Sequence, residues 1–204
     1  MFVKFRLISI IFVFFILLSG CDSTDINTVK ERPVKSENGN MEKISQKLES
    51  YINKDVDNMS QFLITDLKNI KELSQNYFVH YTYKLDEIDY EGIAYLEKVN
   101  GEIEISRTEE VMIDNESRVT NIMATGDFNN ANKRYVVTAG TVNDQGIDTI
   151  LVTYVNQNNV FFKLSSTKRS FLDIQVVEIG EQEIGLEQVI GLDSDRKEIY
   201  KRNE

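Results

Sequence analysis

The chain has 204 residues, a formal net charge of −10 and a single cysteine, Cys21. This length has room for one ordinary domain and short additional segments. An acidic surface repels phosphate backbones, so we expect no nucleic acid partner. A single cysteine cannot form an intramolecular disulfide, and the folded part must therefore be stabilised by its core.

The first twenty residues have the pattern of a secretory signal. Lys4 and Arg6 supply positive charge, and an apolar run follows from Leu7 to Leu18. A bilayer core needs about 20 apolar residues, so this shorter run fits a signal peptide in residues 1–20 better than a permanent transmembrane helix. Loss of the two basic residues on cleavage would change the net charge from −10 to about −12.

Leu18, Ser19 and Gly20 directly precede Cys21. This segment resembles the lipobox of bacterial lipoproteins, in which an aliphatic residue and two small residues precede a cysteine. By this resemblance, Cys21 becomes the mature N-terminus and carries a diacylglyceryl group. Two or more acyl chains anchor a protein stably, because each buried methylene contributes about 0.8 kcal/mol. We therefore expect a lipid anchor in the cell membrane, with the protein on the extracytoplasmic face; an ordinary signal followed by a chance cysteine is the alternative.

The next two segments are predicted as a tether and a helical region. Residues 21–40 are polar, and a flexible chain of this length has a typical reach of about 25 Å. In residues 41–76, apolar residues recur at three- and four-residue spacings, which indicates amphipathic helix. The first stripe contains Ile44, Leu48, Tyr51 and Ile52, and the second contains Met59, Phe62, Leu63, Leu67, Ile70 and Leu73. The region is one long helix or two helices with a break near 55–58, and we favour two.

From Tyr77 onward the apolar residues alternate with period two. Asn100-Gly101 separates two alternating runs and predicts a type I′ hairpin, because both turn residues need positive φ. Further strands are expected at 118–128, 134–142, 147–155, 160–165, 171–179, 186–192 and 198–202. Short strands separated by Asn, Gly and Asp turns favour antiparallel packing. The fold is thus predicted as mainly β: the helical segment, an antiparallel meander in 77–117 and a β-sandwich-like domain in 118–204.

No catalytic or metal-binding pattern emerges. His80 is the only histidine, and it lies within a predicted strand without a nucleophile motif nearby. Zinc favours several His or Cys ligands, which one histidine and one lipid-modified cysteine cannot supply. Asp86, Glu87, Asp89 and Glu91 are interpreted as solvated turn charges, since acid–base hydrolysis needs two acids facing each other across a cleft. We therefore predict no enzyme activity, no cofactor and no metal site.

Tyrosines are concentrated in the predicted meander. Five of the nine are Tyr77, Tyr81, Tyr83, Tyr90 and Tyr95. Tyrosine is favoured at interfaces because it buries area with little loss of rotamer freedom and keeps a polar hydroxyl. It is also a good strand former. The cluster is a candidate binding face, with ordinary strand packing as the alternative.

Several segments of the β region are similar to those of another group of proteins. They resemble a β-domain of small uncharacterised lipoproteins of low-GC Gram-positive bacteria. The segments are residues 138–142, 147–152 and 191–200, together with Phe171 and the hairpin 95–101. This resemblance implies no activity. We expect a non-catalytic binding or accessory module of the cell envelope, whose envelope or protein partner the sequence does not identify. A small-ligand or cation-binding lipoprotein is the alternative.

Overall fold

The computed structural model describes residues 38–54, 56, 58–70, 76–128, 131–180 and 184–203. Within this part the chain forms one helix, α1 (Asn38–Ile52), and eleven strands. The strands are β1 (Met59–Ile70), β2 (Asn76–Leu85), β3 (Ile88–Val99), β4 (Glu102–Met112), β5 (Ile122–Asp127), β6 (Lys133–Thr141), β7 (Thr149–Tyr154), β8 (Asn159–Lys163), β9 (Ser170–Glu178), β10 (Leu186–Leu192) and β11 (Glu198–Asn203). The seven strands expected after residue 118 are all confirmed, with shifts of a few residues at their ends.

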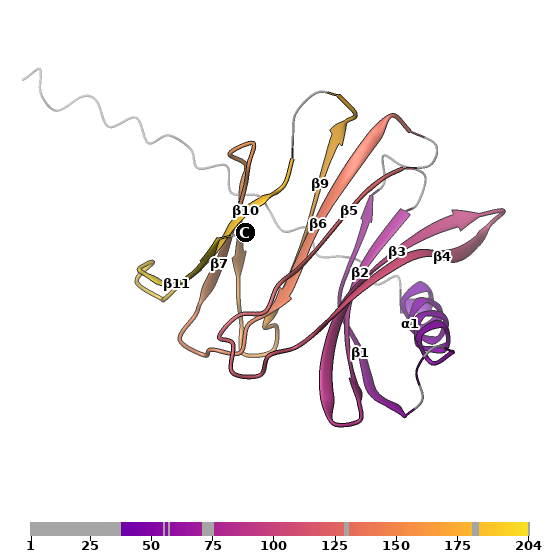
Figure 1. The fold of residues 1–204 in the computed structure, drawn as a ribbon, viewed down its shortest axis with the longest axis horizontal. Helices are drawn as coiled ribbons and strands as arrows, with labels where there is room; N and C mark the ends of the chain where they lie inside the picture. Colours follow the sequence, from indigo (N-terminus) through magenta and orange to yellow (C-terminus); the bar gives the residue numbers. More distant parts are fainter. Residues whose placement is uncertain are drawn as a thin grey trace, which may run out of the picture. The chain divides into compact units, whose positions relative to one another are not determined.

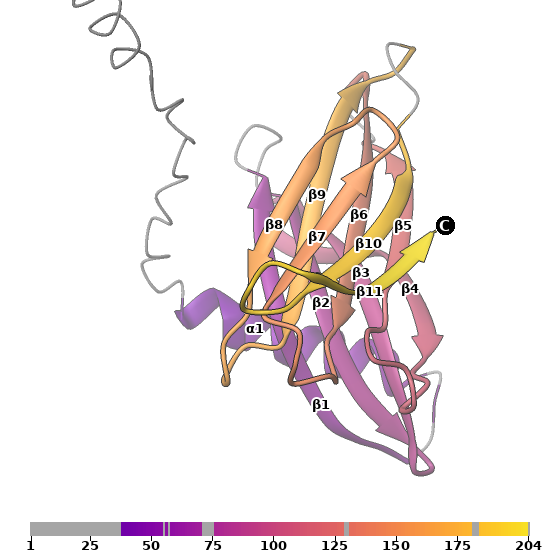
Figure 2. The same cartoon turned by 90° about the vertical axis from the view of Figure 1, so that its left-hand side faces the viewer.

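The strands form three antiparallel sheets (Figure 1). The helix-side sheet has the order β1-β2-β3-β4, the central sheet has the order β5-β6-β9, and the C-terminal sheet has the order β11-β10-β7-β8. Figure 2 shows the C-terminal sheet in front of the central sheet. The mainly β, antiparallel, sandwich-like fold predicted from the sequence is therefore confirmed.

The central sheet is buried on both faces. On one face Val137 and Leu172 pack against Phe78 and Ile93 of the helix-side sheet. On the other face, residues such as Val136 and Phe171 pack against Ile150 and Val152 of the C-terminal sheet. The predicted boundary between residues 117 and 118 falls in the connection between β4 and β5. Segments on both sides of this connection share one hydrophobic core.

Helix α1 covers the outer face of the helix-side sheet (Figure 1). Ile44, Leu48 and Ile52 lie four residues apart, so they form one stripe, and all three are buried against the sheet. Burying side chains of this size contributes about 1.5–3 kcal/mol each. The first predicted helix is confirmed, although it begins at Asn38, inside the segment predicted as tether. The rest of that tether and the predicted signal peptide lie outside the described residues.

The second predicted helix is wrong. Residues 59–70 form strand β1, which pairs antiparallel with β2. The register shifts between Ser60 and Leu63 and again between Ile64 and Asp66. Each such irregularity inserts a residue and moves the alternation by one position. As a result, four apolar residues spaced three, two and three apart all pack toward the same core: Met59, Phe62, Ile64 and Leu67.

The predicted Asn-Gly hairpin is present between β3 and β4. Asn100 has φ 52° and Gly101 has φ 90°, the positive values that a type I′ turn requires. Val99 pairs directly with Glu102 across this turn. The tight turn therefore fixes which backbone groups of β4 face β3 and which face away from it.

Candidate functional site

The predicted lipid site, Leu18, Ser19, Gly20 and Cys21, lies outside the described residues. Among the residues that are described, no helix is both long enough and apolar enough to cross a bilayer.

The predicted tyrosine binding face is contradicted by the burial of its members. Tyr77, Tyr81, Tyr83 and Tyr95 are each less than 5% exposed, and Tyr90 is half-buried. They do not share one face: Tyr95 packs between the helix-side and central sheets, whereas the other four pack on the side covered by α1. Burial on both faces of β2 and β3 explains why this region is aromatic. The alternative, ordinary strand packing, accounts for these residues.

His80 and Glu91 form a buried polar cluster in the helix-side sheet. Both side chains are fully buried, with His80 Nε2 and Glu91 Oε2 separated by 3.4 Å. Thr65 Oγ1 donates to the carbonyl oxygen of His80 at 3.0 Å and lies 2.7 Å from His80 Nδ1. Thr120 Oγ1 donates to Glu91 Oε2 at 2.9 Å. The direction of the hydrogen bond between Thr65 Oγ1 and His80 Nδ1 depends on the tautomer of the imidazole.

This cluster changes the interpretation of the acidic run at 86–91. Asp86 and Glu87 form the exposed turn between β2 and β3 with positive φ, as expected for solvated turn charges. Glu91 is different, because it lies within β3 and is fully buried, so its predicted solvation is wrong. The cluster is enclosed and links β1, β2 and β3 to the segment before β5. Its geometry is that of a structural polar network. The described residues contain no group of three or more His, Cys, Asp or Glu that could hold a metal ion.

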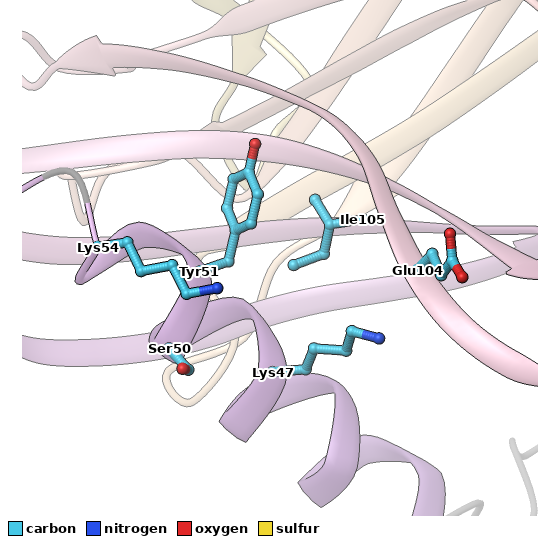
Figure 3. A pocket seen from close by; sticks show the side chains of 6 residues that line it. All are labelled: Lys47, Ser50, Tyr51, Lys54, Glu104 and Ile105. Carbon is cyan, nitrogen blue, oxygen red and sulfur yellow. The ribbon is translucent and has the colours of Figure 1, made fainter.

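An open groove lies between α1 and β4 (Figure 3). Its volume is about 290 Å³. The lining residues are Lys47, Ser50, Tyr51 and Lys54 from the helix and the turn after it, and Glu104 and Ile105 from β4. Figure 3 shows the two ammonium groups reaching into the space between helix and strand. The groove is the candidate binding site of this chain.

The helix and the turn that follows it position four lining residues through their spacing. Residues 47, 50, 51 and 54 follow the i, i+3, i+4, i+7 pattern, which places them on one face. This face adjoins the buried stripe of Ile44, Leu48 and Ile52. Tyr51, which the sequence pattern assigned to the apolar stripe, is 39% exposed and belongs to the groove.

The other wall is the outer edge of β4. In a two-residue hairpin the flanking pair, here Val99 and Glu102, is hydrogen-bonded, and bonded pairs alternate with non-bonded pairs. The backbone groups of Ile103 and Ile105 therefore point away from β3. Consistent with this, the ammonium group of Lys47 donates to the carbonyl oxygen of Ile103. Within the described residues no strand pairs with this side of β4.

The groove is lined mainly by hydrogen-bond donors. Lys47 and Lys54, with the hydroxyls of Ser50 and Tyr51, present these donors on the helix side. Glu104 lies on the β4 wall, but it alternates with Ile103 and Ile105, so its side chain projects to the face of β4 away from α1. These six lining residues include one carboxylate and no histidine or cysteine, so they suit binding rather than acid–base or nucleophilic chemistry.

Sequence reasoning missed this site although part of its signal was present. The polar stripe at 47, 50, 51 and 54 is readable from helical spacing. Its partner, the edge of β4, is some fifty residues away along the chain, and the spacing of the helix says nothing about which strand lies beside it.

Comparison of the chain with protein-family models, curated proteins and solved structures found no match. The groove is therefore interpreted from its own geometry and chemistry.

Proposed function

We propose that this chain is a lipoprotein held at the extracytoplasmic face of the cell membrane by a lipid on Cys21. The proposal is supported by the resemblance of Leu18-Ser19-Gly20-Cys21 to a lipobox, after an apolar run of signal-peptide length. The β domain begins at Asn38, a short distance along the chain from the anchored cysteine.

The domain then acts as a non-catalytic binding module of the envelope, and its binding surface is the groove between α1 and β4. One observation carries this assignment. The groove gathers two ammonium groups, two hydroxyls and an open strand edge within a chain whose net charge is −10. His80, the only histidine, is fully buried, so a substrate could reach it only if the sheets separated.

The anchor is tested by mass spectrometry of the protein purified from membranes. The N-terminal peptide should begin at Cys21 and carry the mass of a diacylglyceryl group. Replacement of Cys21 by Ser should abolish processing or release the protein from the membrane fraction. An unmodified thiol, or unchanged membrane fractionation of the variant, would contradict the anchor.

The groove is tested by photocrosslinking in living cells. A benzoylphenylalanine at Ser50 should give a discrete crosslinked adduct with an envelope partner. The matched control carries the same group at Asp195, an exposed residue in the turn between β10 and β11. Equal adduct yields at both positions would show that the groove is not the binding surface.

A small-ligand role is the second candidate, favoured by the convergence of polar groups in the groove. Its volume of about 290 Å³ is close to the lower end of ligand pockets, about 300 Å³. Native mass spectrometry of the full-length protein from its own membrane distinguishes the two roles. A bound small molecule that is lost in Lys54→Glu supports this candidate.

A further inference from the structure

We propose that the groove binds an extended peptide segment, which adds a strand to the open edge of β4 with acidic side chains toward α1 and basic side chains toward Glu102 and Glu104. This inference rests on the proposed function, in which the groove is the binding surface. The partner is then an extended peptide in which acidic and basic residues alternate.

The first argument is the backbone at the edge of β4. The N–H and C=O groups of Ile103 and Ile105 point outward, at the wall of the groove. The Lys47 ammonium donates to the Ile103 carbonyl oxygen, in the place where the N–H of an added strand would donate. Strand addition to a sheet edge is a general mode of peptide recognition, in which main-chain hydrogen bonds supply affinity and side-chain sites supply specificity.

The second argument is the charge on the helix side. Side chains of an added strand point alternately to the two faces of the sheet. Those on the face covered by α1 would meet Lys47 and Lys54, with Ser50 and Tyr51 as additional donors. Released from Ile103, the Lys47 ammonium would be available to a carboxylate on the peptide. This side therefore selects acidic residues.

The third argument is the charge on the opposite face. Glu104 is directly opposite Glu97 on β3, and Glu102 lies two residues along the same strand. Like charges directly opposite one another destabilise a sheet. Glu97 accepts a hydrogen bond from the Tyr95 hydroxyl at 2.6 Å. Glu102 and Glu104 are both exposed on this face, so a basic side chain from an added strand would lie beside one of them, and this face selects lysine or arginine.

The same charges oppose two other occupants. If a second copy of the chain paired its β4 symmetrically about residue 103, Glu102 of each copy would lie directly opposite Glu104 of the other, and pairing about residue 104 would place the two Glu104 side chains opposite each other. An anionic lipid surface would meet the lysines but also Glu102 and Glu104, and it would leave the strand edge without partners. An alternating peptide satisfies the lysines, the glutamates and the backbone together.

The test is selection of a random twelve-residue peptide library on the full-length protein in detergent. Enriched peptides should carry acidic and basic residues at alternating positions. Their affinity should fall at least tenfold for Lys54→Glu, and Glu104→Lys should shift the enriched sequences toward acidic residues on the corresponding face. Lys201→Glu, an exposed change on β11, is the matched control and should bind like the parent protein.

Methylation of the peptide backbone tests strand addition directly. Two peptides are compared, each N-methylated at every second amide. Binding should be abolished when the methylated amides are those that face β4, and it should stay intact when they are the amides that face away, because only alternate amides face β4. Failure to enrich any peptide, equal binding to Lys54→Glu, or insensitivity to N-methylation would overturn the proposal. Binding of phosphatidylglycerol vesicles that depends on Lys54, without peptide binding, would also overturn it. If the peptide proposal failed in any of these ways, a crosslink at Ser50 would still identify the groove as the binding surface.

Discussion

Tyr81 and Gly92 are directly opposite each other on β2 and β3, and the tyrosine ring occupies the space that a side chain at residue 92 would need. A Cβ at this glycine would overlap Cζ of the ring. The absence of that atom lets the ring cross β3, so that the Tyr81 hydroxyl donates to Glu110 Oε1 at 2.7 Å. Tyr83 donates to the other oxygen of the same carboxylate at 3.1 Å. One glycine thus permits a hydrogen-bonded link across three strands.

Gly92→Ala should destabilise the protein by about 1–3 kcal/mol, because the added methyl group overpacks a buried site and must displace the ring. The free energy of unfolding, measured in urea, checks this. Gly185→Ala is the matched control, since its Cβ would have only an ordinary contact with Val155. Equal decreases in the free energy of unfolding for the two variants would mean that the Tyr81 ring moves aside freely.

The buried His80–Glu91 pair should behave as one unit. Glu91→Leu or His80→Leu alone leaves the other group buried without its partner, at a cost of about 3–5 kcal/mol. The double variant replaces both by apolar groups and should be more stable than either single variant. Thr120 still has the Thr141 carbonyl oxygen as an acceptor.

Urea unfolding of all four proteins completes the double-mutant cycle. Glu102→Gln, an exposed change, should stay within about 0.5 kcal/mol of the parent. A double variant whose loss equals the sum of the two single losses would show that the two side chains do not interact.

The strands after residue 76 were predictable because their signals are local. Alternation over five to twelve residues identifies a strand, and Asn100-Gly101 specifies a turn through the φ values it tolerates. Strand β1 was missed for a physical reason. Its two bulges convert the period of two into spacings of three, and these spacings imitate a helix.

The candidate site was less predictable, because it depends on contacts between distant segments. The burial of Glu91 requires the Thr120 hydroxyl from 29 residues away. The groove requires Lys47 to meet Ile103, 56 residues along the chain. Likewise, the tyrosine cluster resembled a binding face because the sequence did not show that α1 and the central sheet cover both sides of β2 and β3.

Alkaline solution should destabilise the fold through its buried tyrosines. Burial, together with the neighbouring carboxylates Glu110, Glu97 and Asp173, raises the pKa values of Tyr81, Tyr95 and Tyr154 well above 10.0. In the unfolded chain these hydroxyls lose their protons near pH 10.0, whereas in the folded protein they retain them. The folded state then binds more protons, so the contribution of these tyrosines to the free energy of unfolding is constant below that pH and falls as the pH rises above it.

Urea unfolding at pH values on both sides of 10 checks the direction, and ultraviolet absorbance of tyrosinate checks the cause. Tyr154→Phe should reduce the slope of stability against pH, because it removes one of the shifted groups. Ionisation of all nine tyrosines near pH 10, with native circular dichroism retained, would contradict the burial-based explanation.

Two adjacent faces of α1 should have separable roles. Leu48 is fully buried against the helix-side sheet, so Leu48→Ala should cost about 2–5 kcal/mol of stability through lost burial and the cavity left behind. Tyr51 lines the groove and is 39% exposed, so Tyr51→Ala should cost much less stability while weakening binding of groove-selected peptides. Urea unfolding and peptide titration of both variants check this division. A Tyr51→Ala variant that binds normally but loses as much stability as Leu48→Ala would assign Tyr51 to the core, because a residue that belongs to the groove must affect binding more than folding.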